Sequence, residues 1–306
     1  MNPSSCPLTG QLGHPIRTRR PSELSESYRS WFGAPLPHHI VKKYFTLPIT
    51  EYYLKSSGLR WYAPCHLGDG EYYSTLAGLY SWYYNPGSWD KRAVLDIIST
   101  LGPAKILEVG CGDGWLLDKL RERKLNAYGV EINEKAVKDC RERGLKVFLP
   151  GEKGLEVGRN CILCLLQTIE HVPNPYEFAA ALVQQYQPQH IILTAPCFES
   201  MLGYTSDPLS WPPHHATAWS HKGFETLAHL LGYSVSFVGY SPLSYGQLNN
   251  YFEGEGTRKM QNIPYIPTGR LGYFVLKMYQ GLGKSWACRG HSILVVLTQK
   301  DKGELM

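Results

Sequence analysis

Short apolar runs alternate with segments of helical periodicity along most of the chain from residue 104 onward. Apolar or alternating runs predict strands over residues 104–109, 126–132, 145–149, 161–166, 190–196, 233–240 and 291–300. Apolar residues at helical spacing predict helices over residues 114–124, 133–144, 175–187 and 221–231. Continuous apolar strands that alternate with helices are typical of a parallel sheet covered on both faces. The pattern therefore predicts a doubly wound α/β fold with a mostly parallel, seven-stranded sheet.

Two segments fall outside this alternation. Residues 1–90 are rich in proline, tyrosine and tryptophan, and residues 80–89 form the densest aromatic run of the chain. Residues 243–289 separate the last two predicted strands with glycine, asparagine, tyrosine and proline. We therefore predict an N-terminal cap over residues 1–90 and a ligand-binding domain over residues 91–306, which carries the 243–289 insertion.

Composition and charge exclude several classes of protein. The chain is 43% hydrophobic and 19% charged, as in an ordinary globular protein. Its formal net charge is +5, but the basic residues are scattered and form no stripe with interleaved aromatic residues, so a nucleic-acid partner is disfavoured. No apolar stretch approaches the roughly eighteen residues of a membrane span, and the first thirty residues hold no signal-peptide core. We expect a cytoplasmic protein without a membrane span.

The eight cysteines do not indicate a disulfide framework in a chain of 306 residues. Cys161 and Cys164 have a C-x-x-C spacing, but they lie in a predicted apolar strand, where residues three apart point to opposite faces. We interpret both as small buried hydrophobic residues rather than metal ligands.

A glycine-rich turn follows the first strand of the predicted sheet. Such a turn between a strand and a helix lets a ligand approach the backbone and the helix N-terminus. In the dinucleotide fingerprint G-x-G-x-x-G, Gly110 and Gly112 would take the first two places, and Trp115 would occupy the third. Because the third glycine allows close packing of helix on strand, Trp115 argues against a nicotinamide oxidoreductase.

The spacing is instead E-x-G-x-G-x-G over residues 108–114, which resembles the cofactor loop of class I S-adenosylmethionine-dependent methyltransferases. Glu131 closes the next strand, where an acidic side chain can accept hydrogen bonds from ribose hydroxyls. The sequence QTIEHVPNP, at 167–175, is similar to a segment found in one branch of these enzymes. A nucleotide-binding fold of another class is the alternative.

The resemblance implies a Rossmann-like methyltransferase fold and S-adenosyl-L-methionine as cofactor, with S-adenosyl-L-homocysteine as product. It implies these cofactor-binding residues: Glu108, Gly110, Gly112, Gly114, Glu131, Ile132, Phe148, Leu149, Gln167, Thr168 and Tyr84. Many relatives have an aspartate for the adenine amino group just beyond the third strand, where this chain has Pro150 and Gly151.

Further stretches resemble a bacterial branch of the family that is often found with polysaccharide or secondary-metabolite pathways. Relatives in that branch often carry a zinc ribbon before the methyltransferase domain. Cys6 stands at one ligand position of such a ribbon, whereas Thr9, Leu54 and Ser57 stand at others. Since one thiolate cannot hold a structural zinc ion, we expect a degenerate ribbon-like cap without metal.

The acceptor side offers three histidines as candidate catalytic residues. His171, His214 and His215 follow the fourth and fifth strands, at the edge where open α/β sheets bind ligands. Histidine suits a general base for a hydroxyl, although His171 is equally well interpreted as a brace for the glycine loop. The aromatic residues Trp82, Tyr83 and Tyr84 form either a lid over the site or the core of the cap.

These observations favour a methyltransferase that acts on a small molecule, with O-methylation of a sugar or natural-product hydroxyl as the leading hypothesis. A catalytically silent cofactor-fold binding protein and a C- or N-methyltransferase are the alternatives. The sequence specifies neither the acceptor nor an oligomeric state.

Overall fold

The computed structural model describes residues 2–83, 87–200, 207–242 and 289–300, together with residues 271, 274, 275 and 278. The chain folds into two compact units. Unit 1 comprises Met1–Leu67, Pro196–Gly223 and Gly239–Ile293, and unit 2 comprises Gly68–Ala195, Phe224–Val238 and Leu294–Met306. Most of the predicted 243–289 insertion and the predicted cofactor-binding residue Tyr84 lie outside the described residues.

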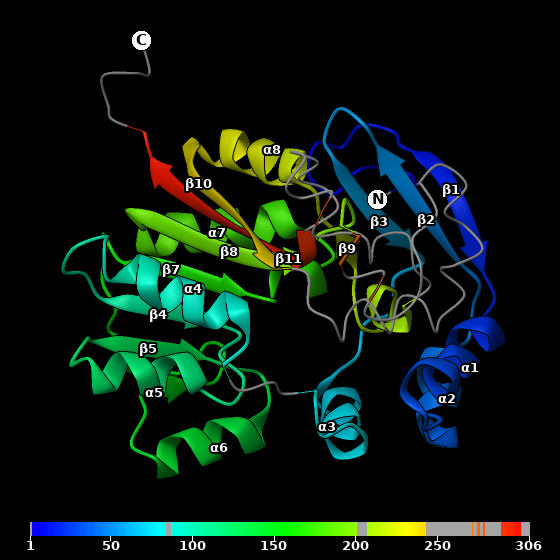
Figure 1. The fold of residues 1–306 in the computed structure, drawn as a ribbon, viewed down its shortest axis with the longest axis horizontal. Coiled ribbons are helices and arrows are strands. Elements are labelled where there is room, and N and C mark those ends of the chain that lie inside the picture. The colour runs from blue at the N-terminus through cyan, green and yellow to red at the C-terminus, as the bar shows by residue number, and fades with distance from the viewer. Residues whose placement is uncertain are drawn as a thin grey trace. The chain divides into compact units, whose positions relative to one another are not determined.

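The seven-stranded sheet occupies most of unit 2 (Figure 1). Its strands are β4 (Ile106–Val109), β5 (Ala127–Val130), β6 (Val147–Phe148), β7 (Ile162–Leu166), β8 (His190–Pro196), β10 (Tyr233–Pro242) and β11 (Arg289–Gln299). Their order is β10-β11-β8-β7-β4-β5-β6, and the run from β8 to β6 is parallel. The predicted fold is therefore confirmed.

Helices precede the first strand of this sheet or lie between its strands in the sequence. They are α3 (Gly70–Leu79), α4 (Trp89–Ile98), α5 (Trp115–Glu122), α6 (Glu134–Glu142), the 3₁₀ helix η1 (Ile169–His171), α7 (Pro175–Tyr186) and α8 (His221–Leu231). Two of these helices begin at residues that suit the position: the Asn133 side chain accepts hydrogen bonds from the Lys135 and Ala136 amides of α6, and Pro175 opens α7. The helices α4 and α5 pack on the apolar side chains of β4, β7 and β8, which form the core beneath the glycine loop.

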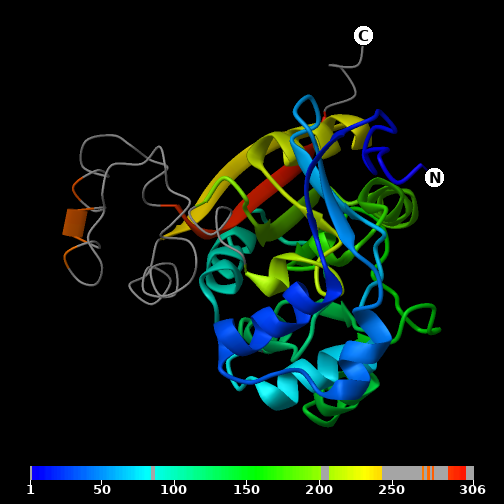
Figure 2. The ribbon, with the colours of Figure 1, turned by 90° about the vertical axis from the view of Figure 1, so that its right-hand side faces the viewer.

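Unit 1 is built on a four-stranded antiparallel sheet of order β1-β2-β3-β9. Its elements are β1 (His14–Arg19), α1 (Pro21–Phe32), α2 (His38–Tyr44), β2 (Ile49–Leu54), β3 (Leu59–Ala63), the 3₁₀ helix η3 (Pro208–Ser210) and β9 (Thr217–Ala218). Figure 2 shows the dark blue helix α1 directly following β1.

This division differs from the predicted boundary at residue 90. Residues 196–223 join the N-terminal segment because Thr217 pairs with Trp61 and Ala218 pairs with Arg60. Residues 68–90, with α3, belong to the unit that holds the seven-stranded sheet. A change in aromatic content marked the predicted boundary, and it does not report which segments contact one another.

Two tight turns meet in the ribbon-like segment. The Gly10 amide donates to the Cys6 carbonyl oxygen, and the Gly58 amide donates to the Leu54 carbonyl oxygen. The buried Cys6 thiol lies 3.4 Å from the Ser57 hydroxyl, which joins the two turns. The structure thus places the expected ligand positions side by side, and that this segment holds no metal stays a prediction.

Two further expectations concern burial and membranes. Cys161 and Cys164 are both buried, as predicted, and burial raises the pKa of the Cys161 thiol to about 11. Over the described residues, no helix combines the length and the apolar character needed to cross a bilayer.

Candidate cofactor-binding site

The glycine loop over residues 110–114 connects β4 to α5 in a backbone conformation that favours glycine. The φ angles of Gly110, Gly112 and Gly114 are +80°, +54° and +72°. All three lie in the left-handed region, which residues with a Cβ atom rarely adopt. The three-glycine spacing read from the sequence is therefore required by the path of the backbone.

Neighbouring side chains also leave no room for a Cβ atom at two of these positions. A Cβ atom on Gly110 would lie 2.5 Å from the Thr168 hydroxyl oxygen, and one on Gly114 would lie 2.8 Å from the Cys140 sulfur. The Thr168 hydroxyl in turn donates to the Val109 carbonyl oxygen at 3.1 Å. Thr168 thus packs against the start of the loop, and helix α6 packs against its end.

A second contact holds the end of the loop from α6. The Arg143 guanidinium, one residue beyond that helix, donates to the Asp113 carbonyl oxygen and forms an ion pair with Asp118 on α5. Sequence reasoning missed Arg143, because nothing in a helix-ending RERG run identifies the carbonyl that its side chain reaches. The loop is therefore held from both sides by contacts within the protein.

Glu131 lies at the end of β5 and faces the loop. One of its carboxylate oxygens accepts a hydrogen bond from the Gly112 amide at 2.9 Å, and the other accepts from the Asn133 amide at 2.8 Å. Each carboxylate oxygen has a further lone pair, so the group can also accept hydrogen bonds from two adjacent hydroxyls. This geometry fits a ribose.

An apolar surface adjoins Glu131. Ile132 is 56% exposed, which is unusual for a large aliphatic side chain beside a buried carboxylate. Phe148 and Leu149, at the end of β6, are partly exposed. Together they offer the flat, apolar contact that an adenine ring would require.

The segment after β6 lacks the aspartate that many relatives have for the adenine amino group, and Glu152 holds the backbone of this segment. Glu152 accepts a hydrogen bond from the Leu149 amide at 2.8 Å and pairs with Arg141 at 2.5 Å. These contacts hold the pKa of the Glu152 carboxyl below its usual value, the amide contact being the larger cause. Glu152 therefore fixes the backbone that follows β6, at the place where Pro150 and Gly151 stand.

Glu108 lies beneath the loop and is 1% exposed. Burial raises the pKa of its carboxyl to about 8, although the Lys91 charge lowers it. Within the described part of the chain, its Oε2 atom has no hydrogen-bond partner. An unpartnered buried carboxyl oxygen fits a site whose donor arrives with a ligand.

The other side of the site is formed by the end of β7. Gln167 has a φ angle of +52°, and its amide donates to the Thr194 carbonyl oxygen at 2.9 Å. The Thr194 hydroxyl donates to the buried Asp90 carboxylate at 3.2 Å. A positive φ in a non-glycine residue costs free energy and is concentrated at functional sites. The strained turn directs the following residue, Thr168, onto the glycine loop.

Comparisons with known proteins agree with this geometry. The family described as Methionine biosynthesis protein MetW matches residues 89–199, a range that contains the glycine loop, Glu131 and η1. A Ubiquinone biosynthesis O-methyltransferase of Methylococcus capsulatus is 24% identical over 173 residues, which are 48% of this chain and 71% of the relative. A protein of the same name from Azoarcus sp. is 29% identical over 97 residues, 29% of this chain and 42% of the relative. Over these ranges the chain is similar to proteins named as O-methyltransferases.

Among solved structures, a SAM-dependent methyltransferase from Archaeoglobus fulgidus has 15% sequence identity and a TM-score of 0.45, and the match covers 68% of this chain and 94% of that one.

The candidate catalytic residue His171 ends η1 in unit 2. Its Nδ1 atom lies 3.2 Å from the Tyr73 hydroxyl, and the two rings meet edge to face with centroids 5.7 Å apart. Tyr73 comes from α3, nearly a hundred positions earlier, and sequence reasoning did not identify it as a partner. The imidazole is therefore held at one nitrogen by a side chain of the same unit.

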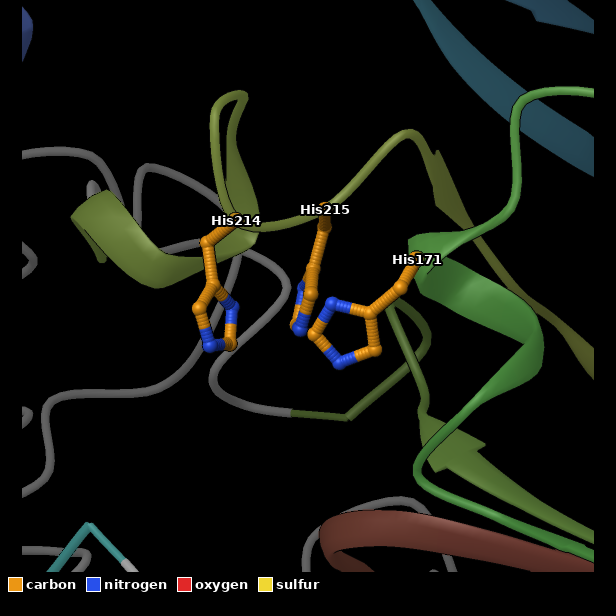
Figure 3. A group of neighbouring side chains, drawn as sticks. All are labelled: His171, His214 and His215. Atoms are coloured by element: carbon orange, nitrogen blue, oxygen red, sulfur yellow. The ribbon is translucent and has the colours of Figure 1, made fainter. Parts of the chain in front are cut away.

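His214 and His215 lie in unit 1, in the turn that follows η3. Figure 3 shows the consecutive side chains leaving this turn, and His171 leaving η1. The two consecutive rings have centroids 4.4 Å apart, and the His214 Nδ1 atom lies 3.0 Å from the Leu209 carbonyl oxygen. Because a carbonyl oxygen only accepts, Nδ1 carries the hydrogen, and the lone pair is on Nε2.

Of the aromatic residues predicted to form a lid or the core of the cap, the structure describes Trp82 and Tyr83. Trp82 stacks on Tyr80 with ring centroids 5.3 Å apart and is 46% exposed. The Tyr83 amide donates to the Tyr80 carbonyl oxygen at 2.9 Å, which closes a local turn. Trp82 and Tyr83 lie in an aromatic turn after α3, and the two interpretations, a lid or the core of the cap, both stay predictions.

Proposed function

We propose that this protein is an S-adenosylmethionine-dependent methyltransferase and that it transfers a methyl group to a hydroxyl of a small molecule, such as a sugar or a natural product. Two observations support transfer to oxygen. The relatives are named O-methyltransferases, and unit 2 holds an oriented histidine beside the residues proposed to bind the cofactor. The location in the cytoplasm, predicted from the sequence, stays a prediction.

The geometry of unit 2 supports the proposed cofactor-binding residues. We assign the ribose hydroxyls to Glu131 and the adenine ring to the apolar surface of Ile132, Phe148 and Leu149. The 110–114 loop would lie along the methionine and ribose portion, where the bare backbone permits close approach.

Four further residues belong to the proposed cofactor site. Glu108 would accept a hydrogen bond at the base of the loop, and Gln167 and Thr168 would line the opposite side through main-chain groups. Tyr84 stays a proposed contact, since it lies outside the described residues.

When bound, S-adenosylmethionine supplies a methyl group on a positively charged sulfur, which an attacking oxygen displaces in line. The protein therefore has two tasks: to position the acceptor hydroxyl and to remove its proton. We assign the proton to Nε2 of His171. For that nitrogen to accept, Nδ1 must carry the hydrogen, which it donates to the Tyr73 hydroxyl oxygen. The observation that carries this proposal is the 3.2 Å contact between Tyr73 and His171.

His214 and His215 are the alternative bases. The carbonyl of Leu209 already sets His214 in the tautomer whose Nε2 can accept a proton. Alanine substitutions at each of the three histidines separate the candidates, because only the true base should lower turnover while leaving cofactor affinity unchanged.

The proposed function is tested by supplying S-adenosylmethionine with a trideuterated methyl group to the enzyme, together with a panel of sugars and phenolic natural products. Mass spectrometry and NMR should identify a labelled methyl ether. A labelled carbon or nitrogen would instead establish C- or N-methylation. Saturable cofactor binding without any labelled product would favour the silent binding protein.

A further inference from the structure

A cavity of about 30 Å³ lies within unit 1, apart from the residues assigned to the cofactor. It has room for about two water molecules, or for one small polar group of a larger ligand. Its charged lining residues are Arg17, Glu51 and Arg60, which come from β1, β2 and β3. His215 and His291 also line the cavity, and each can offer a ring N–H.

The strand register places these charges on one face of the sheet. Arg17 lies directly opposite Glu51, which lies directly opposite Tyr62. Arg60 lies opposite Tyr53, two residues from Glu51, and so projects from the same face. The alternation of side chains along β1, β2 and β3 therefore places two guanidinium groups beside one carboxylate.

The charges of this face do not balance. Glu51 is 1% exposed and gives one oxygen to each partner, at 2.5 Å to Arg17 Nε and at 3.4 Å to Arg60 Nη1. Each guanidinium has about five N–H donors, and a carboxylate has about four acceptor positions, so donors exceed acceptors. In the described part of the chain, the buried Nε of Arg60 has no hydrogen-bond partner. One positive charge and several donors are left over.

Aromatic rings hold the two guanidinium groups in place. The Arg60 guanidinium carbon lies 4.1 Å from the centroid of the Phe198 ring, and that of Arg17 lies 4.8 Å from the Trp211 ring. Planar stacking leaves the N–H edges of arginine available for a planar or tetrahedral anion. Burial raises the pKa of the neighbouring Tyr62 phenol, with the Glu51 charge as the next cause, so its hydroxyl stays a donor.

We propose that this cavity binds one oxyanion group, a carboxylate or a phosphate, between Arg17 and Arg60, with Glu51 holding the two guanidinium groups apart. This proposal does not depend on the proposed function, because all of the residues that form the cavity belong to unit 1.

The experiment titrates ¹⁵N-labelled full-length protein with sodium acetate and, separately, with sodium phosphate, at constant ionic strength in chloride and without cofactor. The side-chain Nε signals of Arg17 and Arg60 are followed by NMR. We expect both signals to shift saturably with at least one probe, and the two probes distinguish a carboxylate site from a phosphate site. Linear, unsaturated shifts with both probes would overturn the proposal.

Variants test the assignment. Arg60→Gln should weaken binding of the probe about tenfold or more, because a charge-assisted hydrogen bond is lost. Arg20→Gln is the matched control: it removes an exposed arginine of the same unit and should leave binding unchanged. If Arg60→Gln fails to fold, Arg60→Lys keeps the charge without the planar fork and should also bind more weakly.

Glu51→Gln provides a prediction of opposite sign. The amide keeps the shape of the side chain but removes a negative charge beside the anion, so the probe should bind several-fold more tightly. Weaker binding by a folded Glu51→Gln variant would mean that the carboxylate is needed for the arginines to stay in place, and would overturn the inference of spare positive charge. If the protein binds the anion but transfers no methyl group, the anion site is upheld and the proposed function is refuted.

Discussion

Replacement of Glu131 by alanine should weaken binding of S-adenosylmethionine and S-adenosylhomocysteine by the same factor. Its carboxylate accepts hydrogen bonds from the Gly112 and Asn133 amides and has lone pairs left for both ribose hydroxyls. The ribose is identical in the two ligands, so the loss falls equally on substrate and product. Turnover at saturating cofactor should change little.

The magnitude follows from these contacts. A hydrogen bond to a charged group contributes about 1.5–3 kcal/mol, and two ribose contacts are lost while the Gly112 amide is left without its acceptor. Allowing for water that replaces the carboxylate, we expect a loss of about 3 kcal/mol, or roughly a hundredfold in the dissociation constant. Glu131→Gln retains one oxygen acceptor and should lose about tenfold.

Isothermal titration calorimetry with both ligands measures the effect. Glu134→Gln is a suitable control, since it removes an exposed carboxylate three residues away in the first turn of α6. Unchanged affinity for either ligand in a folded Glu131→Ala variant would refute the ribose assignment. A loss for one ligand only would show that the carboxylate acts on the methyl or sulfonium group instead.

Three further predictions concern the loop, the proposed base and the buried carboxyl. Gly112→Val should abolish cofactor binding, measured by calorimetry, because a β-branched residue disfavours the left-handed φ of +54°. The circular dichroism spectrum should stay native. Normal cofactor affinity in this variant would exclude the loop assignment. His171→Ala should lower kcat about 10²–10⁴-fold and remove the acidic limb of the pH–rate profile, and Tyr73→Phe should lower kcat less. As a control, substitution of the exposed His229 by alanine should change neither kcat nor the pH–rate profile. If His171→Ala instead lowers cofactor affinity together with kcat, His171 is a brace for the glycine loop and not the base. Since burial raises the pKa of Glu108 from 4.5 to about 8, the folded state keeps a proton that the unfolded state releases between those values. Wild-type stability in urea should therefore fall from about pH 5 to pH 8 relative to Glu108→Gln, and a constant difference would contradict a buried neutral carboxyl.

The sequence predicted the seven-stranded sheet and the position of Glu131 because both depend on local patterns. Apolar runs and glycine spacing involve residues that are close in the sequence, and the positive φ angles of the loop by themselves already favour glycine. The order of the elements then places the end of β5 beside the end of β4, which brings Glu131 to the loop without further information.

Other parts of the site depend on contacts that no local pattern encodes. Thr168 and Arg143 fix the loop from β7 and α6, and Tyr73 reaches His171 from far upstream. The boundary between the two units was missed for the same reason, since it depends on the two-residue strand β9 pairing with β3. A strand of two residues carries no periodicity that could predict it.

The most direct test of the account follows the backbone amide signals of Gly110, Gly112 and Gly114 by NMR while S-adenosylhomocysteine is added, and then repeats the titration with NAD⁺. We predict saturable shifts of all three signals with S-adenosylhomocysteine and none with NAD⁺. Saturable shifts with NAD⁺, or three unchanged glycine signals at saturating S-adenosylhomocysteine, would contradict the assignment of this loop to the methyl donor.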